Sequence, residues 1–146
     1  MIGQVPQILV VDDDARDTQL TQVALESSTD GYGIVVARDG TEALDYLYQR
    51  GKFHGLPKIP PALILLDLKM PKLDGFEVLR AVKQADELRS IPIIVFTSSQ
   101  HAGDVETCYR LGANAYVVKP VAFDQLLKTM EALCSFWLRT NIRSIR

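Results

Sequence analysis

The chain has 146 residues, of which 47% are hydrophobic, which suits one globular domain with a substantial core and leaves little room for a second. Its formal net charge is −2 and it has no basic block, so composition gives no electrostatic basis for nucleic-acid binding. No apolar stretch approaches the length of a membrane span, and the N-terminus lacks the features of a signal peptide, so we expect a cytoplasmic protein without membrane contact.

Short apolar runs alternate along the chain with segments that carry helix signals. The predicted strands are residues 7–11, 34–37, 63–67, 93–97 and 116–119. The predicted helices are residues 14–28, 39–50, 74–87, 102–111 and a fifth that starts near 123. This alternation predicts an α/β fold with a doubly wound, five-stranded parallel sheet and five helices. We expect a flavodoxin-like strand order, 2-1-3-4-5.

Two helices show apolar residues at helical spacing. In the first we expect Leu20, Val23, Ala24 and Ser27 to lie on one face. The fifth carries a longer stripe, composed of Phe123, Leu126, Leu127, Met130, Leu133, Cys134 and Trp137. The stripe from Phe123 to Leu133 is predicted core, whereas Trp137 suits either a core or an interface position. Residues 139–146 form a basic tail.

Four of the five predicted strands end in polar side chains or are followed directly by them. These residues are Asp12 and Asp13, Asp67, Thr97, and Lys119. The carboxyl ends of parallel strands meet at one edge of a sheet, where ligands bind in open α/β folds. Three carboxylates this close cannot all stay ionised without a cation. One divalent ion together with Lys119 would balance their charge.

This set of groups predicts a chemistry. Mg²⁺, with Mn²⁺ as an alternative, prefers oxygen ligands and is commonly held by one or two carboxylates plus phosphate oxygens. Lys119 and the Thr97 hydroxyl can take the remaining oxygens of a phosphoryl group. A carboxylate can act as the nucleophile and form an acyl phosphate. The residues therefore indicate Mg²⁺-dependent phosphoryl transfer to or through Asp67.

The same residues resemble a known family, the receiver domains of two-component response regulators. The resemblance covers residues 7–130 and rests on four motifs in order, which are Val10-Val11-Asp12-Asp13, Asp67-Leu68-Lys69-Met70-Pro71 with Asp74-Gly75, Phe96-Thr97-Ser98, and Tyr116-Val117-Val118-Lys119-Pro120. It implies that Asp67 accepts a phosphoryl group from the phosphohistidine of a sensor histidine kinase. It further implies a signalling domain that catalyses only its own phosphorylation and dephosphorylation.

The resemblance also assigns roles around Asp67. It implies that Asp13, Asp67 and the backbone carbonyl of Lys69 ligate Mg²⁺, and that Asp12 acts partly through water. Lys119 would bind a phosphoryl oxygen.

Other positions are implied to respond to phosphorylation or to tune it. Thr97 would move toward the phosphoryl group, and Tyr116 would follow from an exposed to a buried rotamer. Lys69 and Ser99 occupy positions that set the lifetime of the phosphoryl group. The Lys119-Pro120 bond would be a cis peptide, the uncommon isomer that proline permits.

Two further stretches resemble the stand-alone response regulators that partner bacterial phytochromes: the loop 50–61, with two Gly and three Pro residues, and the Phe136-Trp137 pair. We therefore expect a single receiver domain over 1–146, with its core at about 7–135, a C-terminal extension over 136–146 and no effector domain. The extension is rich in large apolar residues, namely Phe136, Trp137, Leu138, Ile142 and Ile145. Exposed apolar patches often mark interfaces, so we expect a homodimer through the fifth helix and the extension.

Other functions fit parts of the pattern. A phosphatase of the haloacid dehalogenase type shares the Asp12-x-Asp14 spacing, although Arg16 stands where that motif has Thr or Val. A flavodoxin would need a phosphate loop where three carboxylates stand, and the complete site argues against a degenerate receiver used only as a scaffold. A receiver that passes the phosphoryl group onward in a phosphorelay also stays open.

Overall fold

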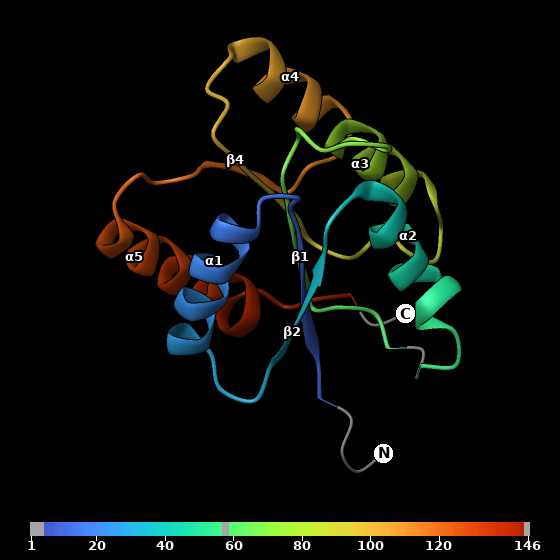
Figure 1. The fold of residues 1–146 in the computed structure, drawn as a ribbon, viewed down its shortest axis with the longest axis horizontal. Coiled ribbons are helices and arrows are strands. Elements are labelled where there is room, and N and C mark those ends of the chain that lie inside the picture. The colour runs from blue at the N-terminus through green and yellow to red at the C-terminus, as the bar shows by residue number, and fades with distance from the viewer. Residues whose placement is uncertain (1–4, 57–58, 145–146) are drawn as a thin grey trace.

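A computed structural model describes residues 5–56 and 59–144 and shows helices and strands alternating along the chain (Figure 1). The strands are β1 (Gln7–Val11), β2 (Gly33–Ala37), β3 (Leu63–Leu66), β4 (Ile93–Thr97) and β5 (Ala115–Val118). The α-helices are α1 (Ala15–Ser28), α2 (Gly40–Tyr48), α3 (Gly75–Gln84), α4 (Ala102–Arg110) and α5 (Phe123–Cys134). A 3-10 turn, η1 (Gly51–Phe53), lies within the predicted loop, and a π-helical turn, η2 (Ser135–Thr140), continues α5.

All strand pairs are parallel, and the sheet order is β2-β1-β3-β4-β5. The predicted order 2-1-3-4-5 is therefore confirmed. Val11 of β1 lies opposite Leu66 of β3, so these two central strands end side by side. The chain reverses its winding direction at this point, where open α/β sheets place their ligand sites.

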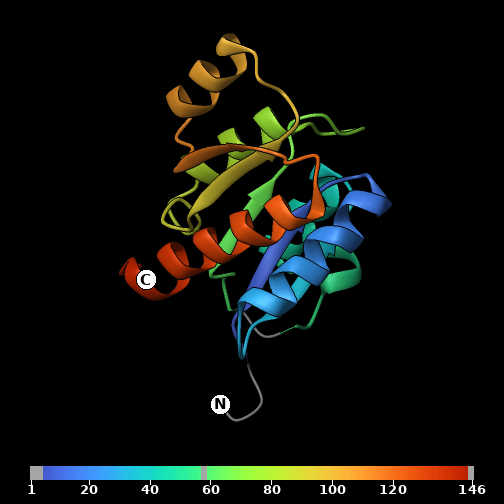
Figure 2. The ribbon, with the colours of Figure 1, turned by 90° about the vertical axis from the view of Figure 1, so that its left-hand side faces the viewer.

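Each face of the sheet is covered by its own helices (Figures 1 and 2). Alternate strand residues point to opposite faces, so one core cluster contains Leu9, Ile64 and Val95 and the other contains Val10 and Leu65. Residues of α2, α3 and α4 complete the first cluster, and residues of α1 and α5 complete the second. Both faces are apolar, which explains why the central strands are continuous hydrophobic runs.

The inward face of α1 differs from the prediction. Leu20 and Val23 are exposed, whereas Thr18, Thr21, Ala24 and Leu25 are buried. The hydrophobic pattern was misleading because two polar residues, Thr18 and Thr21, occupy the buried side of the helix. Burial of Thr18 is possible because its hydroxyl donates a hydrogen bond to the Ala15 carbonyl at 3.0 Å. The helix is pinned at its start by Asp14, whose side chain accepts hydrogen bonds from two backbone N–H groups of the first turn.

Helix α3 ends at Gln84, earlier than predicted, because Ala85 adopts an extended conformation and the following turn buries Leu88. At its other end, Asp74 and Glu77 form a reciprocal capping box. The start of α3 is thereby fixed immediately after the segment that carries Asp67.

The start of the C-terminal extension packs against the domain. Trp137 and Leu138 pack against the cluster shared by α1 and α5, and the Phe136 and Trp137 rings form a T-shaped pair 5.0 Å apart. Phe123, predicted to be core, is 41% exposed at the start of α5. Every helix in the described ranges is too short or too polar to span a bilayer.

Candidate functional site

Two carboxylates lie where β1 and β3 end side by side and the chain reverses its winding direction, which is the switch point of the sheet. Asp12 directly follows β1 and Asp67 directly follows β3, and both side chains are almost completely buried. The Asp67 backbone N–H donates to the Val11 carbonyl at 2.9 Å, and the Asp12 N–H donates to the Ala37 carbonyl at 3.0 Å. The strand pairing therefore extends through both residues and fixes their backbones next to each other.

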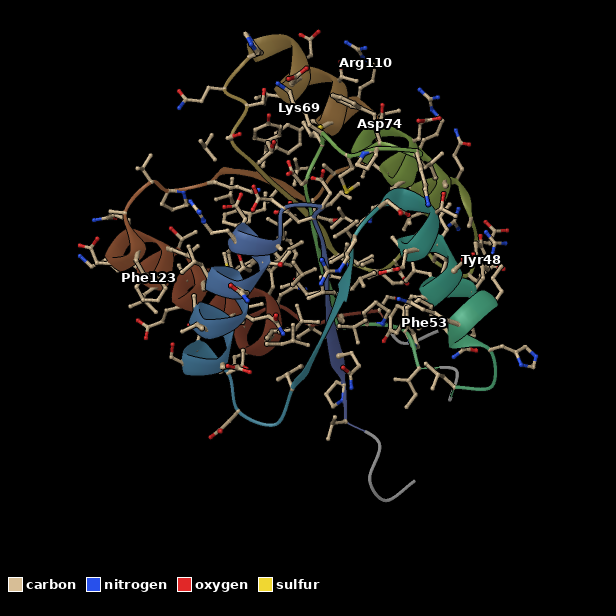
Figure 3. The ribbon with its side chains drawn as sticks, viewed as in Figure 1. Tyr48, Phe53, Lys69, Asp74, Arg110 and Phe123 are labelled. Atoms are coloured by element: carbon tan, nitrogen blue, oxygen red, sulfur yellow. The ribbon has the colours of Figure 1, made fainter. Side chains whose placement is uncertain are left out.

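The backbone around Asp67 leaves no room for a larger residue at the start of α3. A Cβ atom on Gly75 would lie 2.2 Å from the Asp67 carbonyl oxygen, and the Gly75 N–H donates to the Leu68 carbonyl at 2.9 Å. The Leu68 N–H in turn donates to Asp67 Oδ1 at 2.8 Å. Figure 3 shows Lys69 and Asp74 in the segment between β3 and α3. Gly75 thus allows the helix start and the acidic strand end to pack closely.

Lys119 connects the carboxylates. It follows β5, and its Nζ lies 2.7 Å from Asp12 Oδ2 and 3.2 Å from Asp67 Oδ2. A third carboxylate, Asp17 of α1, lies 2.9 Å from the same nitrogen. Burial lowers the pKa of Lys119, but the hydrogen bonds to Asp12 and Asp17 outweigh it and hold the pKa above its ordinary range. Lys119 is therefore fully charged at neutral pH.

Asp12, Asp13 and Asp67 form the one potential metal-ligand cluster of three or more such groups among the described residues, with one oxygen of each within 4.8 Å of the others. Burial raises the pKa of Asp12, and the hydrogen bond from Lys119 opposes that rise only in part. Asp13, unlike Asp12 and Asp67, is exposed to solvent. The three carboxylates offer oxygen ligands, and the single ammonium group of Lys119 does not balance their negative charge. Such a site suits a divalent cation such as Mg²⁺ or Mn²⁺.

Thr97 and Tyr116 lie on the β4–β5 side of the site. Thr97 is buried, and its carbonyl accepts from the Lys119 N–H at 2.8 Å. Tyr116 is half-buried and donates from its hydroxyl to the Ser99 carbonyl at 3.0 Å. Ser99 is buried and donates to Asp104 of α4 at 2.5 Å. A chain of contacts thus links the end of β4 with α4 and β5.

The structure differs from the sequence prediction at Pro120. No peptide bond among the described residues is cis, so the Lys119-Pro120 bond is trans here and the predicted cis isomer is wrong for this structure. The two isomers of an X-Pro bond differ by only about 0.5–1 kcal/mol, so the sequence alone does not fix the choice. The trans geometry already brings Nζ within 2.7 Å of Asp12.

Two residues of the site were missed by sequence reasoning. Asp17 bonds to Lys119, and Asp104 bonds to Ser99. Each lies in the first turn of a helix, where an acidic residue is ordinary because it interacts favourably with the helix dipole. The sequence did offer one signal for them: both helices begin next to the carboxyl ends of the strands, where the functional residues lie.

The fold and the site together define a flavodoxin-like α/β protein with an acidic, lysine-bridged pocket at its switch point. A family model described as "Response regulator receiver domain" matches residues 8–131. The chain belongs to this family of two-component signalling domains.

Individual relatives cover nearly the whole chain. The response regulator Rcp1 of Synechocystis sp. is 41% identical over 133 residues, which are 91% of this chain and 89% of Rcp1. The crystal structure of the phosphorylated cyanobacterial phytochrome response regulator RcpA has a TM-score of 0.90 at 37% identity and covers 97% of this chain and 100% of that chain. The Mn²⁺-bound form of Rcp1 has a TM-score of 0.87 at 38% identity, covering 96% and 99%. The resemblance inferred from the motifs, including its phytochrome-associated branch, is confirmed.

Proposed function

We propose that this protein is a phosphorylation-dependent response regulator in which Asp67 accepts a phosphoryl group from the phosphohistidine of a sensor histidine kinase. The observation that carries the proposal is the position of Lys119 Nζ, within 3.2 Å of both Asp12 and Asp67 at the switch point of the sheet. An ammonium group beside a buried carboxylate supplies the positive charge that a transferred phosphoryl group needs.

The reaction follows from the arrangement. An oxygen of Asp67 forms a bond to phosphorus while the N–P bond of the donor breaks, and the leaving imidazole nitrogen keeps the electron pair and takes up a proton. Lys119 is positioned to bind a phosphoryl oxygen. The product is an acyl phosphate on Asp67, and its hydrolysis returns the domain to its starting state. We therefore regard the protein as a signalling domain rather than an enzyme with a separate substrate.

We propose Mg²⁺ as the cofactor, held by Asp13, Asp67 and the backbone carbonyl of Lys69, with Asp12 acting partly through water. The three carboxylates supply the oxygen donors that this ion prefers. The Mn²⁺-bound form of Rcp1 is a relative with a divalent ion, so Mn²⁺ is the alternative here. When bound, the ion would offset charge on the phosphoryl oxygens during transfer.

The response to phosphorylation is proposed to pass through Thr97 and Tyr116. A buried hydroxyl at the end of β4 can move toward a phosphoryl oxygen, and the Tyr116 side chain already contacts the loop that would move with it. Lys69, exposed after β3, and Ser99 are proposed to tune the lifetime of the acyl phosphate.

The proposed partner is a histidine kinase, and the similarity to RcpA favours a phytochrome. A cleft of about 290 Å³ beside Lys119 is lined by residues of α1 and α5 and the end of β5. Apolar side chains are exposed around it, namely Leu20, Val121 and Phe123. Such a surface next to the reacting carboxylate suits docking of a helix that presents the phosphohistidine.

The proposal is tested by incubating the protein with acetyl phosphate and Mg²⁺ and measuring its intact mass. We expect one phosphoryl group per chain, acid-stable and labile to hydroxylamine, as for an acyl phosphate. A phosphatase of the haloacid dehalogenase type would instead turn over a generic phosphomonoester such as p-nitrophenyl phosphate. Absence of any phosphoryl adduct together with such turnover would reject the receiver function. Transfer onward to a histidine phosphotransfer domain would favour the phosphorelay role.

Mg²⁺ is expected to stabilise the native state. Binding to the native state alone contributes about 1–3 kcal/mol at ten to a hundred times the dissociation constant. Asp13→Ala should remove that gain, because it deletes one carboxylate of the cluster. The measurement is the urea midpoint with Mg²⁺ and with EDTA, and Asp30→Ala, an exposed carboxylate outside the cluster, is the control. Equal midpoints with and without Mg²⁺ in the parent would contradict the metal site.

We also propose a homodimer that uses α5 and the C-terminal extension. Phe136 is 48% exposed and Ile142 is 94% exposed, whereas Trp137 and Leu138 are partly buried against the core. Ile145 lies outside the described residues. The contact proposed here therefore depends on Phe136 and Ile142, and a two-fold axis is the commonest arrangement for such pairs.

The dimer is tested by sedimentation of the parent and of a Phe136→Ser, Ile142→Ser variant, each with and without acetyl phosphate. We expect the parent to associate at tens of micromolar, an order of magnitude typical of modest interfaces, and the variant to stay monomeric. Leu56→Ser, which removes a 48% exposed apolar residue elsewhere, should behave as the parent. Monomers throughout, in both phosphorylation states, would refute the dimer.

A further inference from the structure

The amine of Lys119 is shared between three carboxylates, and one of them lies outside the potential metal cluster. Asp17 Oδ2 is 2.9 Å from Nζ, closer than the 3.2 Å that separates Nζ from Asp67 Oδ2. The cluster that can hold a cation contains Asp12, Asp13 and Asp67 but not Asp17. Asp17 therefore contacts the site through Lys119.

The contact with Asp17 matters because it occupies one of the few hydrogen bonds that the Lys119 amine can donate. An ammonium group has three N–H bonds, and three carboxylates use all of them. If Lys119 is to bind a phosphoryl oxygen on Asp67, one existing contact must weaken. Side-chain exposure is 5% for Asp12 and 12% for Asp67 but 40% for Asp17. Because Asp17 is the most exposed of the three, water can replace its contact with Lys119 most easily.

Asp17 is held in place by the start of α1. Its backbone N–H donates to the Asp14 side chain at 3.0 Å, in the N-cap of the helix. Asp17 and Lys119 also line the same cleft, together with Phe123 at the start of α5, which is labelled in Figure 3. The Asp17 carboxylate thus contacts Lys119, borders the cleft and remains partly exposed to water.

We propose that Asp17 is a positioning residue that holds the Lys119 amine in the unphosphorylated site and competes with the phosphoryl group for it. This inference rests on the proposed function of Asp67. With Asp17 in place, Lys119 is oriented before the phosphoryl group arrives, but its contact with that group is weakened. Removal of the Asp17 charge releases Lys119 to the phosphoryl oxygens and also leaves one negative charge fewer near the bound anion.

The first test uses beryllium fluoride with Mg²⁺ as a stable phosphoryl mimic, with affinity measured by the change in Trp137 or tyrosine fluorescence or by calorimetry. We expect Asp17→Asn to bind the mimic about two- to fivefold more tightly, the range for a partly exposed ion pair. Mg²⁺ alone should bind the variant no more tightly than the parent, because a nearby negative charge is lost. Asp17→Glu should behave like the parent, and Glu26→Gln, exposed on the same helix, controls for net charge.

A merely structural role for Asp17 at the start of α1 predicts a different result. Loss of a helix-start residue would weaken both ligands together, and tighter binding of the mimic would not occur. Equal or weaker affinity of Asp17→Asn for the mimic, in a parent that binds it, would overturn the proposal. If the parent itself does not bind the mimic, the proposed function of Asp67 fails, and the second test still decides whether Asp17 holds Lys119.

The second test is a double-mutant cycle on stability in EDTA, which needs no phosphorylation. Asp17→Asn should lower the urea midpoint of the parent, because it removes a contact with Lys119. In a Lys119→Met background the same substitution should lower the midpoint by less, or raise it, because the interaction of Asp17 with the start of α1 is common to both backgrounds and the contact with Lys119 is already missing. The same change in both backgrounds would show that Asp17 and Lys119 are not coupled, and would overturn the proposal.

Discussion

Asp67→Asn is expected to abolish acyl-phosphate formation while leaving the protein folded. The substitution replaces the nucleophilic oxygen with an amide but keeps the shape of the side chain. Its oxygen can still accept the hydrogen bond from the Leu68 N–H that Asp67 accepts at 2.8 Å. Burial is the main cause that raises the pKa of Asp12, and the charge of Asp67 adds to it, so the substitution also relieves repulsion between the two carboxylates.

The measurement is intact mass after incubation with acetyl phosphate and Mg²⁺, with the urea midpoint as a check of folding. Asp30→Asn, an exposed aspartate elsewhere on the chain, should be phosphorylated like the parent. A hydroxylamine-labile phosphate on the Asp67→Asn protein would mean that another carboxylate is the acceptor. Asp12 and Asp13 would be the first to examine, since both lie in the same cluster.

The sequence was most informative where a single physical constraint determined the outcome. Strands buried on both faces must be continuous apolar runs, so their ends are visible, and parallel strands place those ends at one edge. The juxtaposition of Asp12, Asp67 and Lys119 was predictable for this reason, although these residues are separated by up to 107 positions. The observed strand order agrees with the flavodoxin-like order that was expected from the alternation of strands and helices, although the handedness and switch-point rules allow other orders as well.

The remaining features depend on three-dimensional context that local patterns do not contain. The buried side of α1 carries Thr18 and Thr21, whose polarity hid them from a hydrophobic pattern. Asp17 resembles any acidic residue in a first helical turn, and only the folded position of Lys119 gives it a partner. The isomer at Pro120 rests on a small energy difference that neighbouring contacts decide.

Lys119→Met is expected to have the largest effect on the stability of the metal-free protein. The amine is the one cation hydrogen-bonded to Asp12 and Asp67 among the described side-chain contacts, and its own side chain is 13% exposed. Removing one partner of a buried pair costs about 3–5 kcal/mol, and a value of about 3 kcal/mol suits this partly open site. Mg²⁺ should restore much of the lost stability by supplying positive charge, but not the rate of acyl-phosphate formation, because no amine then binds the phosphoryl oxygen.

The stability lost in Lys119→Met is expected to depend on pH. The pKa of Lys119 is raised in the folded state, so its stabilisation is fully present below the unfolded pKa of about 10.4 and is lost only as pH rises through the higher folded value. The pKa of Asp12 is raised by burial even with Lys119 present, and without the amine it should rise further. The variant should therefore be least stable relative to the parent at neutral pH and should approach it as the carboxylates become protonated. The stability difference between the variant and the parent is measured as urea midpoints between pH 4 and 8, about the range over which buried carboxylates titrate. The control is Lys128→Met, which replaces an exposed lysine of α5. A stability difference that does not change across that range would mean that Lys119 acts by packing rather than by charge.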